Sequence, residues 1–341
     1  MPVHILLVIV SCALSIVTGL VIARGGVGAT ATRQRPLIGL SMDTLKEERW
    51  QVDRDLFTTK VQAAGADVLV QSANSNDAVQ LQNIESLITQ KIDALVIIPH
   101  DGAAMAKAVN LAHQAGIPVL SYDRLITGCD LDLYLTFDNV KVGELQAQFL
   151  ADRIPQSGKL RLIRIYGAKT DNNAKLFKQG QDNILQPLIA AGKVEVIFED
   201  WKPESAKKIT NAAITKNGPN FDAILASNDG TAGGAIQALT EEGLAGKIIV
   251  TGQDADLAAC QRIAQGTQAM TVYKPIHSIA TQAADLALKL ARRQPVIARD
   301  AVANGQIDVP SILLDIVAVT KDNLRETVVK DGFRQESDVF Q

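Results

Sequence analysis

The chain has 341 residues, which is enough for two domains with full hydrophobic cores, and its formal net charge is −3 at pH 7. Hydrophobic residues make up 47% of the sequence and aromatic residues only 4%. This composition is typical of a soluble globular protein and argues against a nucleic-acid-binding protein, which would carry a basic face.

The first 31 residues differ from the rest of the chain. Ile5 to Ala23 is almost wholly apolar, and Ala29-Thr30-Ala31 has the A-x-A form of a signal-peptidase site. No Lys or Arg precedes the apolar run, and its roughly nineteen residues could span a bilayer. We therefore expect residues 1–31 to be a cleaved signal peptide or a retained N-terminal anchor. Both alternatives predict a periplasmic, or otherwise extracytoplasmic, location for the remainder.

After a polar linker at 32–36, short apolar runs alternate with helical patterns. The strands expected in the first half are 37–42, 66–71, 92–98, 117–122 and 133–137. The helices expected between them are 47–64, 77–90 and 103–115. Because the strands are continuous apolar runs, they resemble parallel strands that are covered by helices on both faces.

The same alternation then restarts. The expected helices are 140–153, 173–190, 204–216, 231–242, 256–265 and 277–292. The expected strands are 160–166, 194–199, 221–226, 248–252 and 269–273. A last strand at 313–319 and a helix at 322–329 are expected to pack on this second unit. The fold class is therefore α/β, with two doubly wound parallel-sheet lobes.

Polar side chains follow nearly every predicted strand. The strand at 117–122 ends in Tyr122-Asp123-Arg124, and an adjacent acid and guanidinium are rarely buried unless they are paired. In parallel α/β sheets, ligands bind just outside the carboxyl ends of the strands. The other strand ends carry Asp43, Arg49, Trp50, His100, Asp101, Asp171, Asn173, Trp201, Asn228, Asp229, Gln253, Asp254 and Lys274.

This mixture of side chains suits a sugar. Carboxylates, amides and guanidinium groups form paired hydrogen bonds, which match adjacent hydroxyl groups. Trp50 and Trp201, the only tryptophans, lie in different units and could cover the two C–H faces of a pyranose. The alternative is that both indoles belong to the hydrophobic core. The residues alone predict a two-lobed protein that binds a small polar ligand.

Nine segments resemble the periplasmic D-xylose-binding proteins of ATP-driven sugar importers, which have the type I periplasmic binding protein fold and are similar to ribose-binding proteins. The resemblance covers residues 36 to 338. The segments that carry it are at 48–51, 70–74, 122–124, 137–144, 171–177, 226–229, 231–239, 252–256 and 270–275, among them Glu48-Arg49-Trp50-Gln51, Asp171-Asn172-Asn173 and Gly252-Gln253-Asp254.

The resemblance implies a sugar site shared by the two lobes. Trp50 and Trp201 would stack on the sugar, although the chain is shortened just before Trp201. The residues implied to bond hydroxyl groups are Arg49, Asp123 and Arg124 from the first lobe, with Asp171, Asn173, Asn228, Asp254 and Lys274 from the second lobe and the hinge. No cofactor and no metal are expected.

The resemblance also implies three chain crossings between the lobes, which we expect near Asp138-Asn139, near Lys274-Pro275 and near residues 298–304. The first lobe would then comprise residues 36–138 and 276–300. The second lobe would comprise residues 139–274 and 304–341. A monomer that closes on a pentose, D-xylose in particular, and presents it to an ABC permease is the implied function.

Three other functions compete with this interpretation. A membrane-anchored form could present the sugar to a sensor kinase or chemoreceptor. An enzyme is suggested by G-x-G-x-x-A at 26–31, by S-x-x-K at 205–208 and by the acids Asp123 and Asp254. The first motif lacks a following helix, and the second lacks K-T-G. A transcriptional repressor core would need a DNA-binding headpiece, whereas this N-terminus is an apolar run.

The remaining special residues carry weaker signals. Cys129 and Cys260 have no spacing that indicates a disulfide framework, and we expect two unpaired thiols in separate lobes. The four histidines are scattered. His100, at a strand end, is expected on the surface or behind the cleft lining, and a position in the cleft lining is the alternative.

Overall fold

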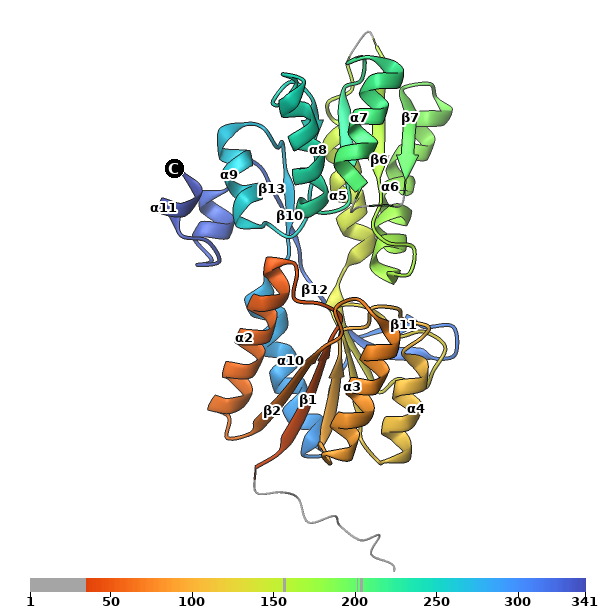
Figure 1. Ribbon diagram of the computed structural model, residues 1–341, viewed down its shortest axis with the longest axis vertical. Coiled ribbons are helices and arrows are strands. Elements are labelled where there is room, and N and C mark those ends of the chain that lie inside the picture. Colours follow the sequence, from red (N-terminus) through yellow and green to blue (C-terminus); the bar gives the residue numbers. More distant parts are fainter. Residues whose placement is uncertain (1–34, 156–157, 201, 203–204) are drawn as a thin grey trace, which may run out of the picture. The chain divides into compact units, whose positions relative to one another are not determined.

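The computed structural model describes residues 35–155, 158–200, 202 and 205–341 (Figure 1). The expected leader at 1–31 and Trp201 lie outside the described residues. Residues Pro36–Gln341 form one unit, which contains two parallel sheets and a small antiparallel sheet. We call the larger parallel sheet with its helices the first lobe, and the remainder of this unit the second lobe.

The first lobe is built on a seven-stranded sheet with the order β11-β12-β5-β4-β3-β1-β2. Its strands are β1 (Leu37–Met42), β2 (Asp67–Ser72), β3 (Ala94–Ile97), β4 (Val119–Tyr122), β5 (Leu133–Phe137), β11 (Asp300–Ala303) and β12 (Asp308–Leu314). All neighbours are parallel except the β11–β12 hairpin. The carboxyl ends of β1, β3 and β4 therefore meet at one edge.

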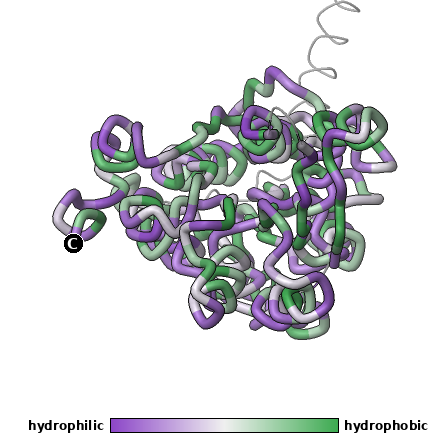
Figure 2. Tube along the Cα trace, turned by 90° about the horizontal axis from the view of Figure 1, so that it is seen from above, coloured by the Kyte–Doolittle hydropathy of each residue, from purple (hydrophilic) through white to green (hydrophobic). Residues whose placement is uncertain are grey.

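Two helices cover each face of this sheet (Figure 1). Helices α2 (Glu48–Ala63) and α10 (Ile276–Ala291) pack together on one face, and α3 (Asp77–Thr89) and α4 (Ala106–Gln114) lie on the other. The helical coils in Figure 2 mix hydrophobic and hydrophilic residues, as expected for helices with one buried side. Helix α10 follows the second-lobe elements in sequence but packs on the first-lobe sheet.

The second lobe is built on a four-stranded parallel sheet with the order β7-β6-β8-β9. Its strands are β6 (Leu160–Ile165), β7 (Val194–Asp200), β8 (Ala223–Ala226) and β9 (Ile249–Val250). Helices α7 (Ala206–Asn217) and α8 (Asp229–Glu241) share one core with this sheet, and α5 (Asn139–Ala151) and α6 (Asn172–Ala190) share another. The α/β class and the two parallel-sheet lobes are confirmed.

The C-terminal segment belongs to the second lobe. Strand β13 (Val317–Val319) pairs antiparallel with β10 (Thr271–Tyr273). Helix α9 (Leu257–Gln265), a π-helical turn at Arg325–Val329 and the short α11 (Glu336–Val339) share a hydrophobic cluster with β10 and β13. No helix in the described part of the chain is apolar and long enough to span a membrane.

The chain crosses between the lobes three times, after β5, after β10 and after β12. The first two crossings lie between Phe137 and Asn139 and between Tyr273 and Ile276. The third lies between Leu314 and Val317 instead of near 298–304, because β11 and β12 complete the first sheet. Residues 304–314 therefore belong to the first lobe, and not to the second as expected. The apolar run 312–319 concealed the crossing, since only Asp315 interrupts it.

Helices α5 and α6 touch backbone to backbone at two glycines. A Cβ atom on Gly143 would lie 2.0 Å from the carbonyl oxygen of Phe177, and one on Gly180 would lie 1.9 Å from that of Val140. We expect Gly180→Ala to lower the free energy of unfolding by about 1–3 kcal/mol, because the helices must separate. Urea denaturation measures this change.

Gly230→Ala is the matched control for this substitution, because Gly230 is also helical but its added Cβ would meet only side-chain atoms at 3.8 Å or beyond. It should be neutral or stabilising by up to about 1 kcal/mol. An equal loss of stability in both variants would contradict the role that we assign to the close contact between α5 and α6.

Candidate functional site

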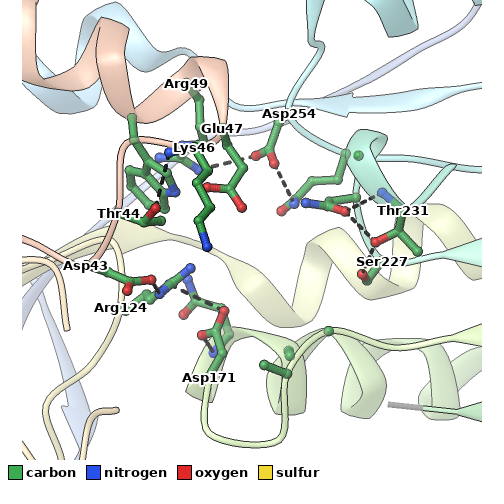
Figure 3. A pocket seen from close by; sticks show the side chains of 18 of the residues that line it. Asp43, Thr44, Lys46, Glu47, Arg49, Arg124, Asp171, Ser227, Thr231 and Asp254 are labelled. Atoms are coloured by element: carbon green, nitrogen blue, oxygen red, sulfur yellow. Dashed lines mark hydrogen bonds and ion pairs between the residues drawn. The ribbon is translucent and has the colours of Figure 1, made fainter. Parts of the chain in front are cut away.

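A cavity of about 620 Å³ is lined by residues from the carboxyl ends of strands in both lobes (Figure 3). From the first lobe, the loops after β1 and β4 and the first turn of α2 contribute. From the second lobe, the first turns of α6 and α8 and the loop after β9 contribute. The carboxyl ends of parallel strands lie at the same edge of a sheet. The polar loops that follow these strands in both sheets therefore border the cavity.

Asp123 lies in the wall of this cavity and is 2% exposed. Its backbone has a φ of 63°, which is uncommon for a residue with a side chain. The backbone is held there because its N–H donates to Leu135 O at 2.8 Å, and its carbonyl accepts from the Thr136 hydroxyl at 2.6 Å. Such strained residues occur preferentially at functional sites.

The charge of Asp123 is stabilised from both lobes. Arg49 Nη2 donates to its Oδ2 at 2.8 Å, and Asn173 Nδ2 from the second lobe donates to its Oδ1 at 2.8 Å. Burial alone would raise the pKa of this carboxyl, but Arg49, Lys274 and Arg124 together lower the pKa to about 2. Asp123 therefore stays ionised at every physiological pH and acts as a fixed hydrogen-bond acceptor.

Arg49 contacts three carboxylates. Its Nε lies 3.3 Å from Asp53, its Nη2 lies 2.8 Å from Asp123 and its Nη1 lies 3.2 Å from Asp254. Burial disfavours the charged guanidinium, yet these carboxylates hold the pKa of Arg49 well above its ordinary value. Because Asp254 belongs to the second lobe, Arg49 links the two lobes across the cavity, as Figure 3 shows.

Asp53 positions Arg49 from one turn further along α2. Its carboxylate also accepts a hydrogen bond from the buried Tyr122 hydroxyl at the end of β4. Burial raises the pKa of Asp53 to about 6, even though Arg49 and the Tyr122 hydrogen bond both act to lower it. The Asp53 carboxylate therefore fixes the guanidinium from behind, on the side away from the cavity.

Arg124 is held between the lobes in a similar way. Its Nη1 donates to Asp43 Oδ2 at 2.7 Å and to Pro99 O at 3.2 Å, and its Nε lies 3.4 Å from Asp171 Oδ2. His100 Nδ1 lies 3.0 Å from the other oxygen of Asp43. Asp171 comes from the second lobe, so Arg124 forms a second link across the cavity.

The second lobe presents helix N-termini to the cavity. Asp171 caps α6 by accepting from the Asn173 N–H at 2.9 Å, and Asn228 caps α8 by accepting from the Thr231 N–H at 3.0 Å. The Asn228 carboxamide oxygen also accepts from the Thr231 hydroxyl at 2.6 Å. Its amide group is therefore the part of Asn228 left to donate to a ligand.

Asp254 and Lys274 complete the second-lobe side. Asp254 has a φ of 101°, and its N–H donates to Val272 O at 2.8 Å, which fixes this unusual conformation. Lys274 follows β10 at a chain crossing and is 2% exposed. Burial lowers the pKa of Lys274, whereas Asp123 and Asp254 raise it. The two strained aspartates, one from each lobe, therefore both act electrostatically on the same buried amine.

The charges of the described lining residues balance. Five carboxylates (Asp43, Glu47, Asp123, Asp171 and Asp254) face five cations (Lys46, Arg49, Arg124, Lys207 and Lys274). Trp50, which is 4% exposed, and Phe177, which is 6% exposed, supply aromatic surface from the two lobes. A balanced polar wall with aromatic surface favours an uncharged, hydroxyl-rich ligand over a phosphate or a carboxylate.

The sequence-predicted site residues come together in this cavity. Those that line it are Arg49, Trp50, Asp123, Arg124, Asp171, Asn173, Asn228, Asp254 and Lys274. Trp201 lies outside the described residues. Trp50 packs in the hydrophobic core of the first lobe and also lines the cavity. The roles of all these residues in ligand binding stay predictions.

Sequence reasoning missed several residues of the site. Asp53 and Tyr122 form the support behind Arg49, and the spacing of four residues between Arg49 and Asp53 on a helix is the signal that could have indicated it. Phe177 is the aromatic residue that the second lobe contributes. His100 lines the cavity, which was the alternative to the expected position on the surface or behind the lining.

The two cysteines of residues 35–341 are free thiols buried in different lobes, as expected. Cys129 lies in the first-lobe core beside α4, and Cys260 lies in the cluster around β10 and β13. Burial, together with nearby carboxylates, raises the pKa of Cys129 to about 11 and that of Cys260 to about 12. Both thiols are therefore protonated and unreactive at neutral pH.

Comparison with known proteins places this cavity in context. The D-xylose-binding periplasmic protein of Haemophilus influenzae is 49% identical over 307 residues, which are 89% of this chain and 92% of that protein. The D-xylose-binding periplasmic protein of Escherichia coli is 49% identical over 306 residues, with the same coverage.

A solved structure supports the same relationship. The carbohydrate transporter solute-binding protein of Chloroflexus aurantiacus, crystallised with D-glucose, is 35% identical and has a TM-score of 0.83, covering 89% of this chain and 98% of that one. The family model described as a periplasmic binding protein domain matches residues 38–295. With two parallel-sheet lobes, three crossings and a cavity at the facing strand ends, this chain belongs to the type I periplasmic binding proteins.

Proposed function

We propose that this chain captures a pentose monosaccharide, D-xylose in particular, in the cavity between its lobes and delivers it to an ABC importer. The observation that carries the proposal is the lining itself, in which strand-end carboxylates, amides and guanidinium groups from both lobes surround a space with balanced charge. The 49% identity to proteins named for D-xylose binding supports the choice of sugar.

Each lobe would bond part of the sugar. From the first lobe, Arg49, Asp123 and Arg124 bond adjacent hydroxyl groups, and Trp50 covers one C–H face of the ring. The second lobe and the hinge would contribute Asp171, Asn173, Asn228, Asp254 and Lys274, with Trp201 on the opposite face of the ring.

Ligand-driven closure would be the mechanism. A ligand shifts an open–closed equilibrium only by its differential affinity for the two states. A shift from mostly open to mostly closed takes roughly 5 kcal/mol. Hydrogen bonds to charged groups contribute about 1.5–3 kcal/mol each, so a few bonds that exist only in the closed state are sufficient. The moving bodies would be residues 36–138 with 276–314, and residues 139–274 with 315–341.

The protein acts in this proposal as a monomeric carrier outside the cytoplasm and not as an enzyme. Asp123 stays ionised because its pKa is held near 2, so it is unsuited to donate a proton as a glycosidase acid would. The paired charges around it are arranged to hold a neutral ligand in place. The closed form would be the form that the permease recognises.

Isothermal titration calorimetry with a panel of pentoses and hexoses tests the proposal. We expect D-xylose to bind more tightly than L-arabinose, D-ribose and D-glucose, with a 1:1 stoichiometry. Aryl β-xylosides should not be hydrolysed. Binding of none of these sugars, or turnover of the xyloside, would refute the proposed function. Uptake into vesicles that contain the cognate permease, measured with and without the protein, distinguishes transport from sensing.

A further inference from the structure

A second contact between the lobes lies outside the cavity, around Glu48 at the start of α2. Arg334, from the C-terminal segment of the second lobe, places its Nη1 2.5 Å from Glu48 Oε1. The backbone N–H of Leu257, the first residue of α9, donates to Glu48 Oε2 at 3.4 Å. Glu48, Arg334 and Leu257 are not among the described residues that line the cavity.

Arg334 is held firmly by its own lobe. Its side chain is 8% exposed, and its Nε donates to Ala255 O at 3.0 Å. The neighbouring Phe333 packs against Tyr273, with ring centroids 5.2 Å apart, and the Tyr273 hydroxyl donates to Asp331. The guanidinium is therefore a fixed group, and formation of its bond to Glu48 depends on the position of the first lobe.

Arg334 bonds residues next to both members of the Arg49–Asp254 ion pair in the cavity. Ala255, which it bonds, has a φ of 53° and directly follows Asp254. Glu48, which it also bonds, directly precedes Arg49 in the first turn of α2. Because Arg49 and Asp254 face each other at 3.2 Å, the Glu48–Arg334 contact and the Arg49–Asp254 contact form together when the lobes approach.

Several acidic side chains lie near the contact between Glu48 and Arg334, so a positive charge is favourable there. Burial raises the pKa of Asp256 to about 7, and Asp254 and Glu48 raise it further, whereas Arg334 and Arg49 lower it. Asp229, fully buried nearby, accepts from the Asp256 N–H at 3.0 Å. Approach of the first lobe therefore brings the Glu48 carboxylate towards an acidic cluster, and Arg334, which pairs with Glu48 directly, offsets this repulsion.

We propose that Arg334 and Glu48 form an interlobe latch that stabilises the closed protein, so that both residues determine ligand affinity without touching the ligand. This inference rests on the proposed function, in which closure retains the sugar. Glu48 is 44% exposed, so solvent screens the pair and its effect is modest. Loss of a contact made only in the closed state acts mainly on the dissociation rate.

The test compares Arg334→Ala, Glu48→Ala and the double variant by calorimetry and stopped-flow fluorescence. We expect each single variant to weaken D-xylose binding by three- to tenfold, with most of the change in the dissociation rate. The double variant should be no weaker than either single variant, because both remove one interaction. Wild-type affinity and dissociation rate in both single variants would overturn the latch.

The control is Arg325→Ala. Arg325 also lies in the C-terminal segment and pairs with Glu336 at 2.7 Å, but this pair stays within the second lobe and is exposed. The Arg325→Ala substitution removes one positive charge from the same segment as Arg334→Ala, and it should leave the affinity for D-xylose and the dissociation rate unchanged. An equal weakening in this variant would attribute the effect to net charge and would also overturn the latch.

Small-angle scattering with and without saturating D-xylose separates failure of the latch from failure of the proposed function. The sugar should lower the radius of gyration of the wild type, because it shifts the protein from mostly open to mostly closed. If the wild type neither binds the sugar nor contracts, the proposed function falls, and the latch that rests on it falls too. If the wild type binds and contracts while both single variants keep its affinity and dissociation rate, the latch alone is wrong.

Discussion

Replacement of Asp123 by asparagine is expected to weaken D-xylose binding by roughly two to three orders of magnitude. The carboxylate is the acceptor for Arg49 and Asn173, and it faces the buried amine of Lys274. In the proposed site the carboxylate also bonds adjacent sugar hydroxyl groups, and hydrogen bonds to charged groups contribute about 1.5–3 kcal/mol each, so their weakening lowers the affinity by this factor. Calorimetry on the purified variant measures the loss.

Asparagine is the informative substitution at this position because it tolerates the positive φ of residue 123, whereas alanine adds backbone strain. Asp130→Asn is the matched control, since Asp130 follows the same strand but is exposed and does not line the cavity. The control should bind as the wild type does. A folded Asp123→Asn variant with unchanged affinity would show that this carboxylate is not part of the sugar site.

The alternating pattern predicted most of the fold because parallel strands and their covering helices leave strong signals. Continuous apolar runs such as Ala94–Ile97 are buried throughout, and the strand from Leu37 to Met42 has the expected bounds. Helix α10 was placed in the first lobe through the family resemblance. Its periodicity shows one buried face but does not indicate which sheet that face covers.

The third crossing could not be predicted for a physical reason. Residues 312–319 form an almost continuous apolar run, but the run is divided between two sheets, one parallel to β5 and one antiparallel to β10. Local hydrophobicity is the same on both sides of Asp315, so the sequence pattern has no marker of the change of lobe. The short hairpin that precedes it, β11–β12, also has mostly exposed residues in β11.

The sequence predicted the candidate-site residues that lie at strand ends. It did not predict the residues that act through contacts with distant elements. The strand-end rule and the resemblance found Asp123 and Asp254, which carry the strained backbone on each side of the cavity. They missed Asp53 and Tyr122, which act behind Arg49. They also missed Glu48, whose partner Arg334 lies 286 residues further along the chain.

Replacement of Arg49 by methionine is expected to abolish sugar binding and to lower the free energy of unfolding by about 3–5 kcal/mol at pH 7.5. Arg49 is 4% exposed and contacts the carboxylates of Asp53, Asp123 and Asp254. Without the guanidinium these carboxylates repel one another in a buried environment, and an uncompensated buried charge is strongly destabilising. Urea denaturation monitored by circular dichroism measures the loss.

The pKa values of the neighbouring carboxyls predict how the stability loss of Arg49→Met changes with pH. In the wild type, Arg49 acts to lower the pKa of both Asp53 and Asp123, so both pKa values rise in the variant. A carboxyl whose folded pKa is raised contributes stability below its unfolded pKa, near 4, and loses it as the pH rises through the folded pKa. The stability deficit of Arg49→Met should therefore be largest at pH 7.5 and should shrink towards pH 4.5.

Two further variants separate the charge cluster from a general loss of positive charge. Arg54→Met removes a neighbouring guanidinium that pairs with exposed Asp55 at 2.7 Å, and its stability should stay within about 0.5 kcal/mol of the wild type. Asp53→Asn combined with Arg49→Met should recover part of the stability at pH 7.5, because one of the three uncompensated carboxylates is gone. A deficit that is equal at both pH values, or that Asp53→Asn fails to reduce, would mean that Arg49 stabilises the protein through packing of its side chain and not by neutralising the acids around it.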